Sequence, residues 1–232
     1  MTSSRFGDGA TPSTDNSVRH ASGVTSIILA GGLGVRFGRN KVWEVFGGKR
    51  LVERVIECLA PLSSRILVVT SERQAASFQG SGLESNLVID LLPGRGPLGG
   101  IYTGLRASES PLNIVVASDM PFLNRDLLAY MLSEAKGYDM VVPLSDDFVE
   151  PLHAVYSKAC AEAMEPLLRE DRFTIRHLMR TVKVRHLDAA ELDRFDPQRL
   201  SYFNIDTQQD MERATRLLEE NPALQCSGIK TI

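Results

Sequence analysis

Residues 29–41 read LAGGLGVRFGRNK and directly follow the short apolar pair Ile27 and Ile28. These thirteen residues contain four glycines, two arginines and a lysine. Glycines after a strand let the backbone approach a ligand closely and leave N–H groups free for phosphate oxygens. The arginine and lysine side chains supply the positive charge that a polyphosphate requires. The stretch therefore predicts a loop that binds the phosphates of a nucleotide.

Two standard phosphate-binding motifs do not fit this loop. A P-loop needs Gly-Lys-Ser or Gly-Lys-Thr, which does not occur in the sequence. A dinucleotide-binding Gly-x-Gly-x-x-Gly fits at Gly32 and Gly34, but its third position is Phe37. The glycine turn instead carries Arg36 and Lys41 on its far side, which favours a triphosphate under attack over a dinucleotide that is only held. A flexible turn with solvated cations is the alternative interpretation.

Composition limits the classes of function. With 232 residues and 43% hydrophobic content, the chain can bury one good core. A net charge of −3 without long charged blocks argues against a nucleic-acid partner, and no apolar run is long enough to span a membrane. The three cysteines are far apart, which argues against a zinc site or disulfides and predicts a cytoplasmic protein: Cys58, Cys160 and Cys226.

Apolar runs and helical patterns alternate between polar ends. Residues 1–23 are expected to be a disordered extension, residues 24–220 one domain, and residues 221–232 a loose tail. The predicted strands are 26–29, 66–69, 87–89, 114–117, 140–143 and 153–156, and the predicted helices are 51–59, 97–107, 127–132, 159–168 and 208–219. This order predicts an α/β fold, a single-domain three-layer α/β/α Rossmann-like arrangement with a mostly parallel sheet. Ligands bind beyond the carboxyl ends of such strands.

Asp119 and Asp90 each follow a predicted strand and should therefore reach this edge. Asp119 is a hard oxygen ligand beside the expected triphosphate site, which suits Mg²⁺; a helix N-cap is the alternative. Asp90 could accept a hydrogen bond from a ribose hydroxyl or a base, or could simply belong to the turn before Pro93. The glycine-rich residues 93–100, including Gly99, could approach a base or sugar, or could be an ordinary connection to a helix.

Residues 203–210 combine an expected strand end with a helix start. Thr207 and Asp210 form a capping-box pattern, which leaves Asn204 and Asp206 as oxygen donors for a second metal or for the acceptor.

A basic run follows residue 171. Arg172, Arg176 and Arg180 would share one helical face that could hold an anion, although a solvated face is the commoner explanation. His153 and the cysteines of predicted helices are interpreted as structural.

These motifs together resemble the molybdenum cofactor guanylyltransferase family, within the nucleotidyltransferases that share a Rossmann-like fold. The family's Leu-Ala-Gly-Gly-x-x-x-Arg-x-Gly-x-x-Lys motif is met by residues 29–41. Its Gly-Pro-Leu-x-Gly, Asp-x-Pro and Asn-x-Asn/Asp-Thr motifs are met at residues 96–100, 119–121 and 204–207. The resemblance covers residues 24–220, with the motifs in the family's order.

The resemblance implies Mg²⁺-dependent transfer of GMP from GTP to the phosphate of molybdopterin, with release of pyrophosphate. It implies a magnesium site at Asp119. For this reaction we expect catalytic roles for Arg36, Lys41 and Asp119, and Asp206 is a further candidate metal ligand from its position before the last helix. The nucleotide-binding residues implied by the resemblance are Leu29, Ala30, Gly31, Lys41, Asp90 and Asp119. The two glycine-rich segments add Gly32 and Gly99 as expected nucleotide contacts. Molybdoenzyme-maturation proteins are possible partners.

Two positions depart from the family pattern. Ser118 replaces a cysteine of many relatives, and residues 70–72 replace an asparagine that contacts the nucleotide in some. The second departure leaves open a transferase that uses CTP or another NTP on a pterin, a sugar phosphate or cobinamide phosphate. A non-catalytic nucleotide-binding protein that delivers the cofactor is the alternative from another class.

Overall fold

The computed structural model describes residues 23–31, 41–145 and 148–225. Within these ranges, no helix has the length and apolar character needed to cross a bilayer. The predicted Arg36 and Gly32 lie outside the described residues.

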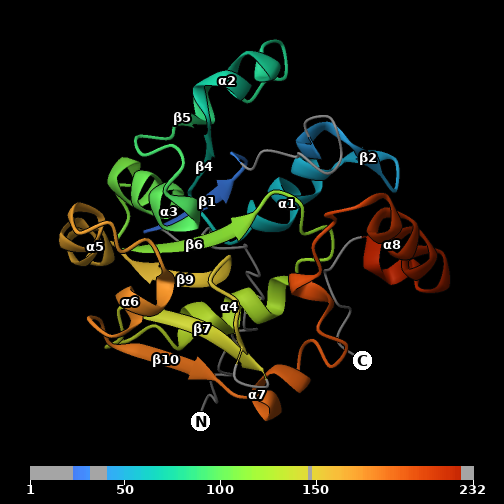
Figure 1. The fold of residues 1–232 in the computed structure, drawn as a ribbon. Coiled ribbons are helices and arrows are strands. Elements are labelled where there is room, and N and C mark those ends of the chain that lie inside the picture. The colour runs from blue at the N-terminus through green and yellow to red at the C-terminus, as the bar shows by residue number, and fades with distance from the viewer. Residues whose placement is uncertain (1–22, 32–40, 146–147, 226–232) are drawn as a thin grey trace, which may run out of the picture.

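A central sheet organises the described chain (Figure 1). Its strand order is β10-β7-β9-β6-β1-β4-β5, and β8 pairs with β7. Only β9 runs antiparallel to its neighbours along this order, because it pairs antiparallel with both β6 and β7. The strands are β1 (Val24–Leu29), β4 (Arg65–Thr70), β5 (Leu87–Ile89), β6 (Leu112–Ala117), β7 (Met140–Ser145), β8 (Phe148–Val149), β9 (His153–Ser157) and β10 (Val184–Leu187). The predicted α/β fold with a mostly parallel sheet is confirmed.

Alternating strand side chains make two cores, one on each face of the sheet. Ile27 and Val115 pack with helices α3 (Gly96–Ala107), α5 (Cys160–Arg169) and α6 (Ile175–Met179). Their neighbours Ile28 and Ile114 pack on the other face with α1 (Leu51–Leu59), α4 (Arg125–Ser133) and α7 (Ala189–Asp193). All four of these strand residues are fully buried, as strands covered on both faces require.

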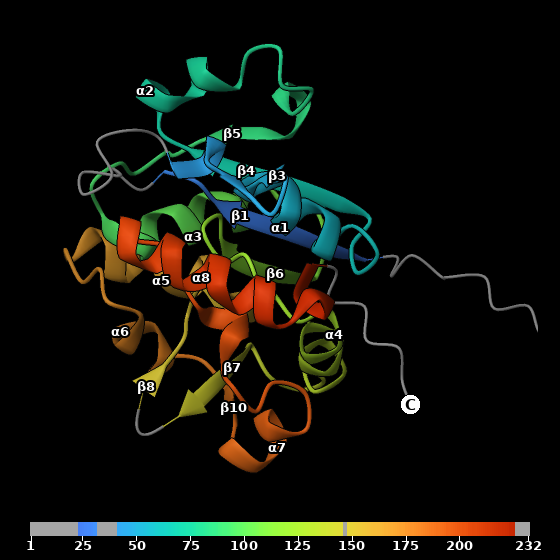
Figure 2. The same ribbon diagram turned by 90° about the vertical axis from the view of Figure 1, so that its right-hand side faces the viewer.

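A third, smaller core attaches the C-terminal helix α8 (Gln208–Glu220), which lies nearest the viewer in Figure 2. Leu218 and Ala214 of α8 pack with Phe46, Leu51 and Ile205. Phe46 belongs to a small hairpin of β2 (Val45–Phe46) and β3 (Lys49–Arg50). This core fixes residues 203–207 beside the carboxyl edge of the sheet.

The predicted helix face of arginines is wrong. Helix α6 spans only Ile175–Met179, so Arg176 is helical while Arg172 and Arg180 lie outside the helix. The strand expected before Asn204 is also absent, because the described chain passes from a 3-10 helix at Leu200–Tyr202 into an unpaired extended segment.

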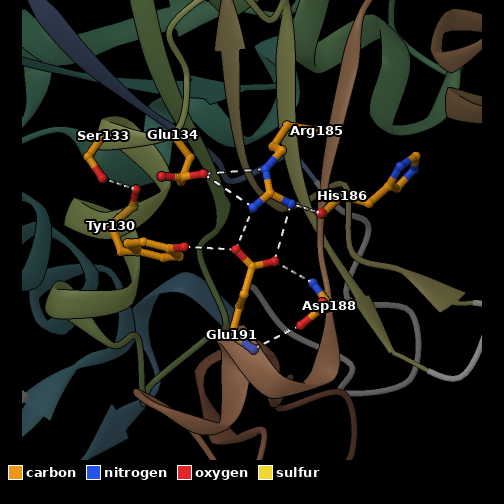
Figure 3. Close-up of polar contacts among 7 residues, drawn as sticks. All are labelled: Tyr130, Ser133, Glu134, Arg185, His186, Asp188 and Glu191. Carbon is orange, nitrogen blue, oxygen red and sulfur yellow. Dashed lines mark hydrogen bonds and ion pairs between the residues drawn. The ribbon is translucent and has the colours of Figure 1, made fainter.

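Strand β10 was missed by sequence reasoning because Arg185 and His186 interrupt its apolar pattern. Figure 3 shows why Arg185 is tolerated there: its guanidinium lies between Glu134, which caps the C-terminus of α4, and Glu191 of α7. The Arg185 Nη2 to Glu134 Oε2 distance is 3.2 Å, and Tyr130 Oη donates to the same Glu191 carboxylate at 2.8 Å. The cluster joins the edge strand to two helices and lies within the scaffold rather than in the pocket described below.

Candidate active site

A pocket of about 770 Å³ lies at the carboxyl ends of β1, β4, β5 and β6. Its walls come from distant parts of the sequence, as the topology of an open α/β sheet predicts. Among the residues that line it are Leu29, Ala30, Gly31, Lys41, Ser71, Arg73, Asp90, Gly100, Ser118, Asp119, Asn204 and Asp206. Most of the predicted site residues that the structure describes therefore come together in one cavity.

The floor of the pocket is held by hydrogen bonds between strand ends. Ala30 N donates to Val69 O at 2.8 Å, and Ser118 N donates to Leu29 O at 3.1 Å. Gly100 allows helix α3 to approach this floor, since a Cβ there would lie 3.4 Å from two methyl carbons of Leu29. These contacts fix the backbone at the start of the glycine loop, at residues 29–31.

Lys41 contacts both carboxylates at one end of the pocket, which we call the charged end. Its Nζ donates to Asp119 Oδ2 at 3.0 Å, to Asp206 Oδ1 at 2.7 Å and to Ile205 O at 3.2 Å. The side chains of Lys41 and Asp119 are only 15% and 17% exposed, whereas that of Asp206 is 55% exposed. One ammonium group therefore joins the glycine loop, the end of β6 and the segment before α8.

The pKa of Lys41 reflects two opposing effects. Burial is the largest single influence and lowers it, but the hydrogen bond to Asp206 and the charge and hydrogen bond of Asp119 together raise the pKa above its usual 10.5. Lys41 is therefore a full positive charge at neutral pH. A permanent cation at this position can neutralise phosphate oxygens, and it cannot serve as a general base.

Local capping fixes the backbone of Asp206. Its N–H donates to Asp210 Oδ2 at 3.1 Å, and Thr207 Oγ1 donates to the same oxygen at 2.7 Å. Asp210 N in turn donates to Thr207 Oγ1 at 3.2 Å, which completes the predicted capping box. The Thr207 hydrogen bond is the main reason that the pKa of Asp210 is lowered. The preceding Ile205 is fully buried and its N–H donates to Asp119 O at 3.0 Å.

The donor set at this end fits a magnesium ion bound together with phosphates. Asp119 and Asp206 direct carboxylate oxygens at the same Lys41 Nζ, so these oxygens lie near each other within the pocket. In the part of the chain that is described, no group of three or more His, Cys, Asp or Glu side chains could hold a metal. Magnesium usually takes one or two carboxylates plus substrate phosphates and keeps several waters, so a complete protein cage is not needed.

Asp90 forms the rim at the end of β5. Its N–H donates to Thr70 O at 2.8 Å, which ties it to the end of β4, and its side chain is half-buried. Asp90 Oδ1 accepts from Leu92 N and from Thr103 Oγ1, each at 3.0 Å. The carboxylate is therefore fixed at the opposite side of the β1 loop from Asp119, as the strand order places β4 and β5 there.

The structure separates the glycines of the second glycine-rich segment. Gly94, Gly96 and Gly100 line the pocket, and the first two have positive φ values of 83° and 62°. Gly99 faces the connection before α3, where a Cβ would lie 2.8 Å from Leu92 O. Gly99 thus allows tight packing of this turn, and its predicted contact with nucleotide stays a prediction.

Sequence reasoning overlooked Arg73, which lines the pocket from the short helix α2 (Glu72–Ala75). Its neighbour Ser71 was noted only as part of a departure from the family pattern. The available signal was position, because residues 71–73 directly follow the carboxyl end of β4.

His153 and Cys160 are fully buried, and burial lowers the pKa of His153 to about 4 and raises that of Cys160 to about 12. At neutral pH these pKa values leave the His153 imidazole and the Cys160 thiol uncharged, which agrees with the structural roles expected for both residues.

Comparison with known proteins gives a consistent result. Residues 26–189 match the family described as the MobA-like NTP transferase domain. The chain is 36% identical over 212 residues to a protein of Natronomonas pharaonis named probable molybdenum cofactor guanylyltransferase, covering 84% of this chain and 98% of that one. It is 32% identical over 193 residues to the molybdenum cofactor guanylyltransferase of Desulfosudis oleivorans, covering 82% and 94% respectively.

A solved structure supports the same relationship. The crystal structure of molybdopterin-guanine dinucleotide biosynthesis protein A from Archaeoglobus fulgidus superposes with a TM-score of 0.73 at 29% identity. The match covers 84% of this chain and 99% of that one. Because the family match spans more than half of the chain and the relatives align over nearly their whole lengths, the chain belongs to the MobA-like NTP transferase family of nucleotidyltransferases.

Proposed function

We propose that this nucleotidyltransferase moves GMP from GTP to the phosphate of molybdopterin, with Mg²⁺, and releases pyrophosphate. The observation that carries the proposal is the junction of Lys41 with Asp119 and Asp206 inside the pocket. It combines a fixed cation for phosphate oxygens with two carboxylates for a metal. The names of the guanylyltransferases to which the chain is similar support GTP and molybdopterin as the substrates.

The chemistry follows from charge and position. The acceptor phosphate attacks the α-phosphorus of GTP in line, the bond from the α-phosphorus to the bridging oxygen breaks, and pyrophosphate leaves. A phosphate monoester is already an anionic nucleophile, so no general base is required. Positioning and charge neutralisation then carry the rate, as in phosphoryl transfer generally. Lys41, together with Arg36, offsets the charge that develops on the departing pyrophosphate.

Asp119 and Asp206 would hold the magnesium ion. The ion, when bound, supplies further positive charge to the triphosphate. Lys41 keeps both carboxylates oriented toward the pocket, and Ile205 anchors the segment that carries Asp206. The backbone of residues 29–31 lines the pocket floor, where it would lie against the phosphate groups.

The test is pyrophosphate release from each NTP in turn, with molybdopterin or a candidate phosphorylated acceptor, with and without Mg²⁺. We expect activity with GTP and molybdopterin only when Mg²⁺ is present. Asp119→Ala should abolish turnover and leave the fold intact, as measured by circular dichroism and thermal unfolding. Wild-type-like activity in Asp119→Ala would exclude the metal assignment, and activity with CTP alone would exclude the guanylyl assignment. GTP binding without pyrophosphate release would favour a delivery protein.

A further inference from the structure

Thr103 is a buried polar side chain that none of the catalytic steps uses. It lies on α3, it is fully buried, and its hydroxyl makes two hydrogen bonds. Thr103 Oγ1 donates to Asp90 Oδ1 at 3.0 Å and accepts from Leu91 N at 3.1 Å. The hydroxyl's single proton is thus committed to Asp90.

Because of these contacts, the two carboxylate oxygens of Asp90 differ in their hydrogen bonding. Oδ1 accepts from Thr103 Oγ1 and from Leu92 N, which fills both of its lone-pair positions. Oδ2 has no hydrogen-bond partner among the described residues, and Asp90 lines the pocket. The carboxylate is therefore held so that one oxygen is used by the fold and the other remains for a ligand.

The strand order indicates which part of a nucleotide this oxygen meets. Lys41, Asp119 and Asp206 occupy the β6 side of the pocket, and Asp90 lies beyond β1 and β4 at the end of β5. With the triphosphate at the charged end, the base extends toward Asp90. A carboxylate oxygen accepts hydrogen bonds only, so it selects a base edge that donates. Guanine offers N1–H and the 2-amino group on one edge.

We propose that Thr103 is a positioning residue for base selection: it saturates Asp90 Oδ1, and thereby aims Oδ2 at the N1–H and 2-amino group of guanine. The inference rests on the proposed function, since it takes GTP as the nucleotide. It adds that base preference depends on a buried threonine outside the pocket lining. Removal of the hydroxyl leaves Leu92 N–H as the remaining partner of Asp90 Oδ1, so the carboxylate is held less firmly and discrimination between bases weakens more than phosphate binding does.

The experiment is calorimetric titration of the full chain with GTP, ITP and XTP in the presence of Mg²⁺. ITP lacks the 2-amino group, and XTP carries a carbonyl at that position. Wild-type protein should prefer GTP over ITP, and Thr103→Val should reduce that preference about tenfold. Thr103→Ser keeps the hydroxyl and should retain the preference. Thr25→Val is the matched control, because Thr25 is equally buried and hydrogen-bonds to Ser110 Oγ at 2.8 Å near the start of β1.

Asp90→Asn provides a second, sharper arm. Leu92 N–H and Thr103 O–H both donate to the inner position, so the amide oxygen must occupy it and the amide NH₂ must replace Oδ2. The group that faces the base then donates instead of accepting. Preference should therefore shift from GTP toward XTP, with Thr103 intact.

The outcomes separate the two proposals. A wild-type protein that does not bind GTP refutes the proposed function, and this inference falls with it. A wild-type protein that binds GTP and ITP equally well overturns the inference alone. A wild-type protein that prefers GTP, while Thr103→Val keeps the same GTP-to-ITP ratio, overturns the inference alone. The same is true if Thr25→Val loses the preference as strongly as Thr103→Val, or if Asp90→Asn keeps favouring GTP over XTP.

Discussion

Replacing Lys41 by methionine removes the charge at the centre of the site and keeps most of the unbranched apolar part of the side chain. Three hydrogen bonds are lost, from Nζ to Asp119, Asp206 and the carbonyl of Ile205. Two carboxylates that shared one cation then face each other without it. The substitution therefore tests whether Lys41 acts chiefly on the substrate or chiefly on the fold.

The cost in stability can be bounded from the geometry. The ion pair to Asp206 is screened because that side chain is 55% exposed, so it contributes at most about 1 kcal/mol. The bond to Asp119 joins side chains that are 15% and 17% exposed, and a hydrogen bond to a charged group there contributes about 1.5–3 kcal/mol. These two carboxylate contacts together contribute about 3 kcal/mol, which corresponds to a Tm lower by about 6–12 °C. The protein should therefore remain folded at an assay temperature near 25 °C.

The effect on catalysis should be larger than the effect on folding. Loss of one preorganised charge that stabilises the leaving group lowers kcat by about 10²–10³-fold. Lys49→Met is the matched control, since Lys49 Nζ lies 2.7 Å from Glu57 Oε2 with both side chains about half exposed. That variant should keep wild-type kcat and lose less than about 1 kcal/mol.

The assay is pyrophosphate release at saturating GTP and acceptor, combined with denaturant unfolding of each variant. Because the pKa of Lys41 is raised in the folded protein, its stabilising effect is complete below the pKa of the unfolded chain and is lost only as pH rises through the higher folded value. The stability difference between wild type and Lys41→Met should thus stay constant from neutral pH to about pH 9. A folded Lys41→Met protein with more than about a tenth of wild-type kcat would refute the proposed role in charge neutralisation.

Three further predictions concern the scaffold. Burial lowers the pKa of His153 from 6.5 to about 4, so the unfolded chain binds a proton at His153 more readily than the folded protein does. The free energy of unfolding should therefore fall by about 2 kcal/mol between neutral pH and about pH 5. Denaturant titrations should show a smaller fall in His153→Gln, and an equal fall would contradict this prediction. Arg185→Ala should lower the free energy of unfolding by about 1 kcal/mol. Arg185→Lys should not restore it, because an ammonium group cannot form paired hydrogen bonds to both glutamates as the planar guanidinium does. Full recovery of stability in urea unfolding of Arg185→Lys would contradict this explanation. Gly104→Ala places a Cβ 2.4 Å from Ile27 Cγ2. The cost of overpacking, about 1–3 kcal/mol, should exceed the gain in helix propensity, about 1 kcal/mol, so the free energy of unfolding should fall. A stabilised variant would contradict the close packing of α3 on β1.

Much of the fold was predictable because its signals are local. The unbroken apolar runs at β1, β4 and β6 indicated buried parallel strands, and the α8 capping box at Thr207 gave the start of that helix. Strand β10 was not predictable in this way, because the charge of Arg185 breaks its pattern and is compensated by residues of other elements. The arginine run after residue 171 failed for the opposite reason, since a helical spacing of charges does not require a helix.

In the candidate site too, positions set by strand ends were predictable and contacts between distant residues were not. Asp119 and Asp90 could be placed at the sheet edge from the ends of their strands, because parallel strands bring their carboxyl ends together. Their partners could not be predicted, since Lys41 meets Asp119 across 78 residues and Asp206 across 165. Thr103 shows the limit most clearly. In sequence it is one more residue in a glycine-rich helix, and only the packing of that helix beside β5 brings its hydroxyl to Asp90. The residues proposed to bind the substrate directly lie at strand ends, where topology predicts them, whereas the residue proposed to orient Asp90 becomes visible only through the contact that it makes.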